Sequence, residues 1–141
     1  MAKDEPDLRS ELECFPEIDP GVQVLGDRIL VQLRREKNTS KGGIILVDET
    51  RQTLRFNETV AKVLQIGPLA YKSPDDLTPW VEGPWCKVGD LVRTIKYGGD
   101  RFIVQPDDGG APVVFITLQA REVISKIKSF EYAQKMKAFV D

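Results

Sequence analysis

Apolar and polar residues alternate in several short stretches of the chain, and a period of two is typical of β-strands with one buried face. The alternation is clearest in GVQVLGDRILVQLRRE (residues 21–36) and in TVAKVLQIG (residues 59–67). KVGDLVRTIKYGGDRFIV (residues 87–104) predicts two further strands separated by a glycine turn. The pattern therefore predicts a chain built mainly from short strands.

A hairpin follows these strands. QPDDGGAP (residues 105–112) predicts a tight loop, because Asp108-Gly109 tolerates the positive φ that such turns require. VVFITL (residues 113–118) is the predicted return strand. Short β-branched strands at close spacing, without a βαβ rhythm, predict an all-β barrel or sandwich.

The two ends of the chain differ from this pattern. Residues 1–20 are acidic and rich in proline, which predicts an irregular or disordered N-terminal extension. Near the other end, REVISKI (residues 121–127) fits either a strand or a helix. SFEYAQKMKAFV (residues 129–140) has apolar residues at helical spacing and predicts a short helix that covers the barrel, with Ser129 as its N-cap. We therefore expect three parts: an extension (1–20), a β-barrel domain (21–127) and a C-terminal extension (128–141).

Composition limits the classes of function. The 141 residues suit one domain with a core. No apolar run approaches the roughly 18 residues of a membrane span, and the acidic first residues do not resemble a secretory signal. We therefore expect a cytoplasmic protein. The net charge of −2 gives no field that would draw nucleic acid or a membrane surface.

Side chains suited to catalysis are scarce. The chain has no histidine, on which most general-base and zinc chemistry depends. Cys14 and Cys86 lack the spacing of a metal site, which predicts reduced thiols. Asp107 and Asp108 are adjacent in a turn, where solvated turn formers are more common than a catalytic pair. We therefore expect a protein that is not an enzyme and holds no metal.

A basic run stands at the start of a long polar segment. Arg34, Arg35 and Lys37 alternate with polar residues, which favours a solvated face. The segment continues to about Thr59 and encloses one apolar cluster after two glycines. The cluster fits either a buried strand, Ile44–Val47, or a binding segment, because compact domains rarely keep structureless stretches of this length.

GPLAYKSPDDLTPWVEGPWCK (residues 67–87) is a second long segment. Its four prolines exclude a regular central strand. Tyr71, Trp80 and Trp85 either pin this loop to the barrel or provide stacking surfaces for a ligand.

Six motifs in order resemble the GroES family of co-chaperonins. They are GDRILVQ, GGIIL, VLQIG, VGDLV, the YGG turn and EVISKI. The similarity covers roughly Val22 to Ile127. It implies an irregular β-barrel with a long mobile loop, to which the pattern of residues 129–140 adds a short C-terminal helix.

The resemblance also implies a non-enzymatic function. Family members form a homo-heptameric ring that caps a GroEL-type chaperonin and closes the chamber in which unfolded substrate proteins fold. The ring needs no cofactor of its own, because the partner binds and hydrolyses ATP. The matching mobile loop is about residues 37–54, and the chaperonin-binding residues would be Gly42, Gly43, Ile44, Ile45 and Leu46.

The family pattern further implies contacts between subunits and a roof. The stretch Gln23–Val31 would pair with Glu122–Ile127 of a neighbouring subunit. Residues 68–87 stand where family members have the hairpin that roofs the dome, and the loop is longer here. The longer loop and both extensions suggest a divergent or bacteriophage-encoded member.

Two other classes compete with this interpretation. The substrate domain of a zinc alcohol dehydrogenase shares a similar barrel, but it requires cysteine and histidine ligands and a nucleotide-binding domain that this chain lacks. A barrel of the oligonucleotide-binding type would use Tyr71, Trp80 and Trp85 to stack single-stranded nucleic acid, and it would need a basic groove.

Overall fold

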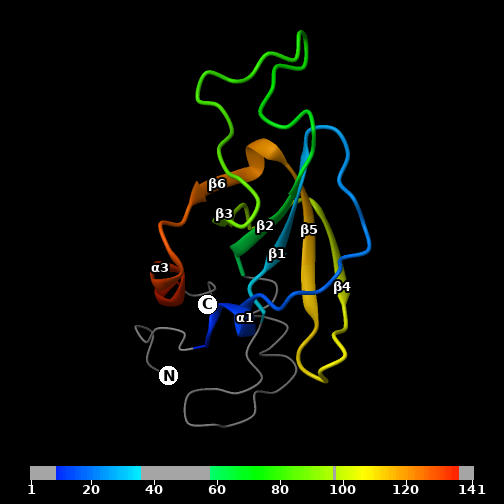
Figure 1. The fold of residues 1–141 in the computed structure, drawn as a ribbon, viewed down its shortest axis with the longest axis vertical. Coiled ribbons are helices and arrows are strands. Elements are labelled where there is room, and N and C mark those ends of the chain that lie inside the picture. Colours follow the sequence, from blue (N-terminus) through cyan, green and yellow to red (C-terminus); the bar gives the residue numbers. More distant parts are fainter. Residues whose placement is uncertain (1–8, 36–57, 97, 137–141) are drawn as a thin grey trace.

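A single antiparallel sheet forms the centre of the protein. The computed structural model describes residues 9–35, 58–96 and 98–136, and Figure 1 shows their arrangement. The strand order is β4-β5-β1-β2-β3-β6, so β4 and β6 are the two edges. The elements are α1 (Glu11–Cys14), β1 (Arg28–Leu33), β2 (Val60–Ile66), β3 (Leu91–Thr94), β4 (Asp100–Val104), β5 (Val113–Gln119), a 3-10 turn η1 (Ala120–Glu122), β6 (Val123–Lys126) and α3 (Phe130–Lys135).

The predicted all-β fold with a C-terminal helix is confirmed. The expected hairpin is present, since β4 and β5 pair antiparallel on both sides of the turn that contains Gly109, whose φ is +76°. The ambiguous stretch near residue 124 is the edge strand β6, paired with β3. The C-terminal helix follows Ser129, although the Ser129 side chain makes no capping hydrogen bond.

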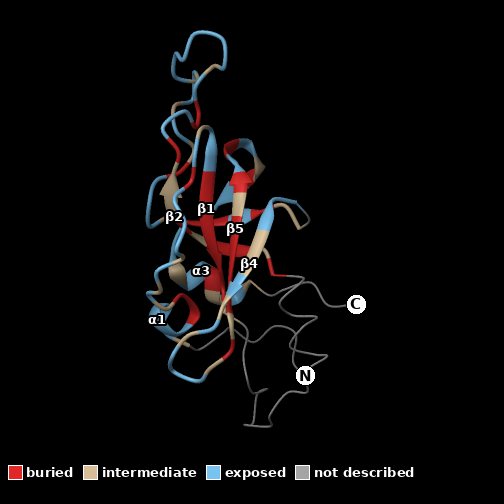
Figure 2. Cartoon of the chain, turned by 90° about the vertical axis from the view of Figure 1, so that its right-hand side faces the viewer, coloured by how far each residue is buried: buried red, intermediate tan, exposed pale blue. Residues whose placement is uncertain are grey.

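Strand β1 differs from the half-buried strand that its alternation predicts. Five of its six residues are buried, because both faces of the strand are covered. Ile29 and Val31 face the main core, whereas Leu30 packs in a second cluster with Phe115 on the other face. Gln32 is buried on that second face too, where its amide donates to the carbonyl of Pro16 at 3.0 Å. Figure 2 shows the resulting buried centre of the sheet.

The turn after β2 depends on a glycine. A Cβ at Gly67 would lie 2.7 Å from the carbonyl oxygen of Arg28 and closer still to that of Gly26. The backbone here also bonds Gly67 N–H to Arg28 O at 2.8 Å. The close approach of the two backbones excludes any larger residue at position 67 and fixes the turn that leads into the long loop.

The N-terminal extension is more ordered than the sequence predicts. Ser10 and Glu13 form a reciprocal capping box that starts α1. Cys14 and Phe15, which end this short helix, are both buried against the sheet. The expectation of an irregular or disordered extension is therefore wrong for Ser10–Phe15, because these residues cover apolar surface of the sheet.

Candidate functional site

The predicted binding residues fall in a segment whose two ends the structure describes. Gly42, Gly43, Ile44, Ile45 and Leu46 lie outside the described residues, and so does the alternative strand Ile44–Val47. The segment leaves the sheet after β1 and returns at the start of β2. These strands are antiparallel neighbours, so their adjacent ends bring both ends of the segment together.

A buried ion pair joins these two ends. Arg34 Nε donates to Glu58 Oε2 at 3.0 Å, and Arg34 Nη2 donates to Glu58 Oε1 at 3.2 Å. The side chains are only 5% and 9% exposed. A forked contact between guanidinium and carboxylate is geometrically specific, and removing one partner from a buried pair leaves an uncompensated charge. The separation of the two ends is therefore held by charge as well as by the sheet.

The C-terminal helix completes the hydrogen bonding of this pair. Arg34 Nη1 donates to the carbonyl oxygen of Ala133 in α3 at 2.8 Å. On the other side, Glu58 Oε1 accepts hydrogen bonds from the N–H groups of Thr59 and Val60, at 3.1 and 2.9 Å. The pair thus links α3 to the first residues of β2.

Arg35 holds the same end of β1 in a different way. Its backbone N–H donates to Cys14 O at 2.8 Å, and its Nε donates to Ala111 O at 2.8 Å. Its two terminal nitrogens contact the two carboxylate oxygens of Asp108, each at 2.9 Å. Hydrogen bonds from Arg35 and from the Gly110 N–H lower the pKa of Asp108 to about 2.

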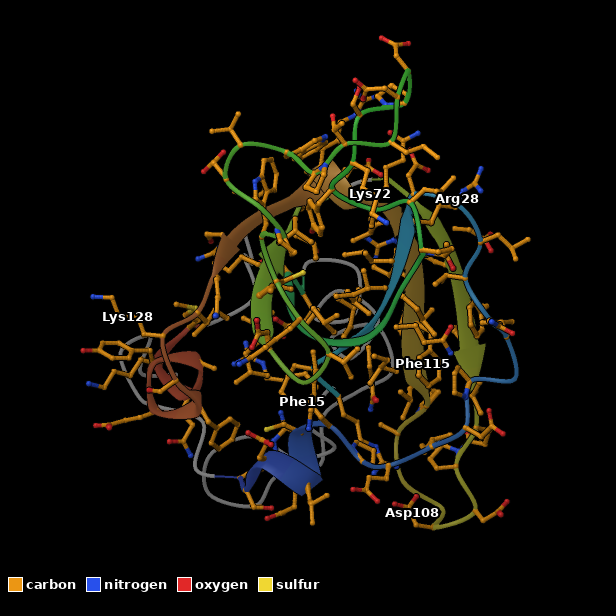
Figure 3. All side chains as sticks on the ribbon, turned by 45° about the horizontal axis from the view of Figure 1, so that its top comes forward. Phe15, Arg28, Lys72, Asp108, Phe115 and Lys128 are labelled. Carbon is orange, nitrogen blue, oxygen red and sulfur yellow. The ribbon has the colours of Figure 1, made fainter. Side chains whose placement is uncertain are left out.

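These contacts correct the interpretation of the basic run as a solvated face for Arg34 and Arg35, whereas Lys37 lies outside the described residues. Arg34 is buried and Arg35 is largely so, because both reach groups that are distant in the sequence. Figure 3 shows Asp108 at the tip of the β4–β5 hairpin. Its side chain is 56% exposed, which agrees with a turn former. One signal was available in the sequence: Arg34 follows one predicted strand and Glu58 precedes the next, and antiparallel neighbours would place them side by side.

An apolar cluster lies beside the ion pair and joins the two extensions. Phe15 from the N-terminal extension and Ala133 from α3 are buried together with Val60 and Leu91 of the sheet. Gln134 Nε2 also donates to the carbonyl of Arg9 at 3.2 Å. Both extensions therefore pack at the end of the sheet where β1 ends and β2 begins (Figure 1).

The long loop 68–87 projects from the opposite end of the molecule (Figure 1). Its base is held by three aromatic rings: the centroids of Tyr71 and Trp80 are 5.4 Å apart, and those of Trp80 and Trp85 are 5.1 Å apart. The rings pack against the main core, which favours the interpretation that they pin the loop. A ligand-stacking role is disfavoured because Tyr71 is buried.

The Tyr71 hydroxyl adds a polar contact under this loop. It donates to Ala120 O at 3.0 Å and contacts the sulfur of Cys86 at 3.4 Å. Burial raises the pKa of Tyr71 well above its usual value, with the Cys86 contact adding to the shift. Burial likewise raises the pKa of the Cys86 thiol. Both groups are therefore neutral at physiological pH and serve packing.

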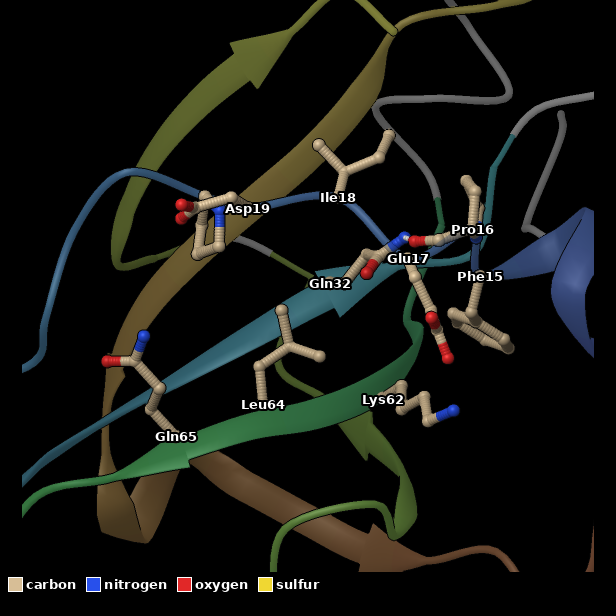
Figure 4. A pocket seen from close by; sticks show the side chains of 10 residues that line it. Phe15, Pro16, Glu17, Ile18, Asp19, Gln32, Lys62, Leu64 and Gln65 are labelled. Atoms are coloured by element: carbon tan, nitrogen blue, oxygen red, sulfur yellow. Dashed lines mark hydrogen bonds between the residues drawn. The ribbon is translucent and has the colours of Figure 1, made fainter. Parts of the chain in front are cut away.

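A shallow groove of about 410 Å³ runs between the N-terminal extension and the outer face of the sheet. Figure 4 shows that Pro16 and Ile18 of the extension border it on one side, with Leu64 and Gln65 of β2 on the other. Within residues 9–35, 58–96 and 98–136 no group of histidine, cysteine or acidic side chains could hold a metal ion. In the same ranges, no helix has the length and apolar character of a membrane span.

Comparisons with known proteins agree with this geometry. The sequence model of the family described as "Chaperonin 10 Kd subunit" matches residues 21–127. Co-chaperonin GroES of Chlamydia pneumoniae is 30% identical over 107 residues, which is 76% of this chain and 91% of the relative. The protein of the same name from Chlamydia felis is 32% identical over 104 residues, 74% of this chain and 88% of the relative. Co-chaperonin GroES of Lactobacillus acidophilus is 35% identical over 78 residues, 55% of this chain and 74% of the relative.

The fold and the matched range define the class of this protein. Because the family match covers more than half of the chain, the protein belongs to the chaperonin 10 kDa subunit family. Its role is that of a GroES-type co-chaperonin.

Proposed function

We propose that this protein caps a GroEL-type chaperonin ring in the presence of ATP and closes the chamber in which unfolded substrate proteins fold. The observation that carries the proposal is the family match over residues 21–127, which includes the whole segment between Arg35 and Glu58. In this proposal ATP is bound and hydrolysed by the chaperonin, and the co-chaperonin needs no cofactor. The protein acts in the cytoplasm, where such a partner would be found.

The docking residues in this proposal are Gly42, Gly43, Ile44, Ile45 and Leu46. Burying three large aliphatic side chains contributes on the order of 5 to 9 kcal/mol, while each residue that becomes ordered opposes binding by roughly 1 to 2 kcal/mol. One segment alone therefore binds weakly. Several copies in one ring bind strongly together, because later contacts become intramolecular, and each contact still releases easily.

A ring, which we propose to be homo-heptameric, would use the free edge of β6. The outer edge of β6 pairs with none of the described residues, and Ile124 on this strand is 64% exposed. Val22 and Leu25 are also exposed and belong to no strand. We propose that residues 21–25 of one subunit pair with β6 of the next. The part of the earlier expectation that reaches from Arg28 to Val31 is wrong, because β1 pairs with β2 and β5 on its two edges.

Loop 68–87 is proposed as the roof of the dome, since it projects from the end of the sheet opposite the one where β1 ends and β2 begins (Figure 1). Its only described pairing is an isolated bridge between Lys72 and Pro79. The roof of this member would therefore consist of irregular loops held at their base by the aromatic rings.

The test is to measure the size of the pure protein and then mix it with a GroEL-type ring. We expect a seven-subunit ring that co-sediments with the chaperonin when ATP is present and stays free without nucleotide. A protein that remains a single subunit at every concentration, or that never binds the chaperonin, would refute the proposal. Binding to a single-stranded oligonucleotide with steep salt dependence would instead support the nucleic-acid alternative.

A further inference from the structure

The two terminal extensions, which lie outside the family match, converge on the ends of the docking segment. The match begins at residue 21 and stops at residue 127. Cys14 O, from the N-terminal extension, accepts the backbone N–H of Arg35, the last described residue before the segment. Ala133 O, from the C-terminal extension, accepts Nη1 of Arg34. Each extension thus supplies one backbone carbonyl to the same short stretch of chain.

These contacts matter for stability because the groups that make them are buried. The Arg34 side chain is 5% exposed, so water cannot replace a lost partner without entering the cluster. If α3 moved away, the N–H donor that now reaches Ala133 would be left unpaired, and the apolar surface of Val60 and Leu91 beneath α3 would be uncovered. Opening α3 therefore weakens the Arg34–Glu58 pair and the hydrogen bonds that Glu58 accepts from the N–H groups of Thr59 and Val60.

We propose that the terminal extensions, α3 above all, hold the Arg34–Glu58 pair in place and thereby strengthen binding to the chaperonin. The proposal rests on the function proposed above. Arg34, Glu58 and Ala133 are positioning residues, because they act on the ends of the docking segment and not on the partner. When the ion pair is intact, the residues at both ends of the docking segment are already held in place, so fewer residues lose conformational freedom on binding. Any gain at one segment is repeated at every copy in a ring.

The first test uses the unchanged protein and needs no chaperonin. Hydrogen exchange in low denaturant should show the amides of Thr59 and Val60 opening together with the amide of Ala133, before Val63 in the middle of β2. The reason is that Glu58 holds the first two amides and depends on α3 through Arg34. If Thr59 and Val60 kept the protection of Val63 while α3 opened, the proposed coupling would be wrong.

The second test displaces α3. Ala133 is buried, so Ala133→Glu should push the helix from its site, whereas Glu131→Gln changes an exposed position of the same helix. In the Ala133→Glu variant we expect the amides of Thr59 and Val60 to exchange faster than in the unchanged protein. We also expect the assembled ring of this variant to bind the chaperonin at least about tenfold more weakly. Glu131→Gln should match the unchanged protein in both measurements.

The outcomes separate this inference from the proposed function. Unchanged chaperonin affinity of a folded Ala133→Glu ring would overturn the inference and leave the proposed function standing. If the unchanged protein fails to bind the chaperonin, the proposed function falls and the exchange experiment alone decides the coupling. If Ala133→Glu does not fold, the exchange pattern of the unchanged protein still supports or overturns the role of α3.

Discussion

The two ends of the molecule are stabilised by different physics. At the end with the extensions, Arg34 and Glu58 form a buried ion pair, and Arg34 makes hydrogen bonds to defined oxygen atoms of Glu58 and Ala133. At the other end, loop 68–87 is held at its base by packed rings, while the side chain of Val81 in the same loop is fully exposed, at 106%. Directed contacts fix a geometry, and apolar packing tolerates adjustment. The difference suggests that the first end needs a defined position and the second only needs attachment.

The largest effect is expected at the ion pair. Arg34→Met would leave the Glu58 carboxylate buried without its partner, which destabilises by about 3 to 5 kcal/mol. Chemical denaturation of the variant and of the unchanged protein measures the difference in unfolding free energy. Replacing both residues together, Arg34→Met with Glu58→Met, should restore much of the loss because no buried charge remains. A loss below about 1 kcal/mol for Arg34→Met would show that the pair does not stabilise this end.

A smaller effect is expected at the base of the loop. Tyr71→Phe keeps the ring packing and removes the hydroxyl that donates to Ala120 O. An unpaired buried carbonyl costs about 1 to 2 kcal/mol, so the melting temperature should fall by a few degrees. Val81→Ser, at a fully exposed position of the same loop, is the matched control and should change the free energy of unfolding by no more than about 0.5 kcal/mol. Equal effects of the two variants would contradict the distinction between the buried base and the exposed part of the loop.

The smallest effect on stability is expected for a substitution of Asp108, and its size depends on pH. Its pKa is about 2 in the folded protein and about 3.9 in an unfolded chain. The lowered pKa adds stability that is fully present above about pH 4 and is lost as the pH falls through about 2. Asp108→Asn should therefore lower the melting temperature slightly at pH 5, with the difference shrinking toward pH 2. Asp107→Asn is the control, and a difference independent of pH would count against the Arg35–Asp108 contact.

Local patterns in the sequence predicted the strands but not their full burial. Alternation placed Ile29 and Val31 on one face of β1, and this was confirmed because a strand's period of two is a local property. The same pattern missed the burial of Leu30 and Gln32, since that depends on the N-terminal extension crossing the other face. One local signal for the extension was present: Ser10-x-x-Glu13 is a capping-box pattern, and the structure forms it.

The candidate site was predictable in part. The motif GGIIL could be recognised from the motif order, and its five residues remain a prediction because they lie outside the described residues. The ion pair joins residues 24 positions apart, and its third partner, Ala133, is 99 positions from Arg34. Contacts at such separations require the sheet topology and the path of both extensions. The positions of Arg34 after one predicted strand and Glu58 before the next indicate that the two could lie side by side, but composition and spacing do not contain the path of the extensions.

The central claim is that Ile44, Ile45 and Leu46 serve a partner and are not part of the protein's own core. The most direct measurement is Ile45→Asp, compared with Val81→Asp as the same kind of change at an exposed position of loop 68–87. We predict that Ile45→Asp keeps the melting temperature and ring size of the unchanged protein and no longer binds the chaperonin with ATP, while Val81→Asp still binds. If Ile45→Asp unfolds instead, the apolar cluster is a buried strand and the account is wrong.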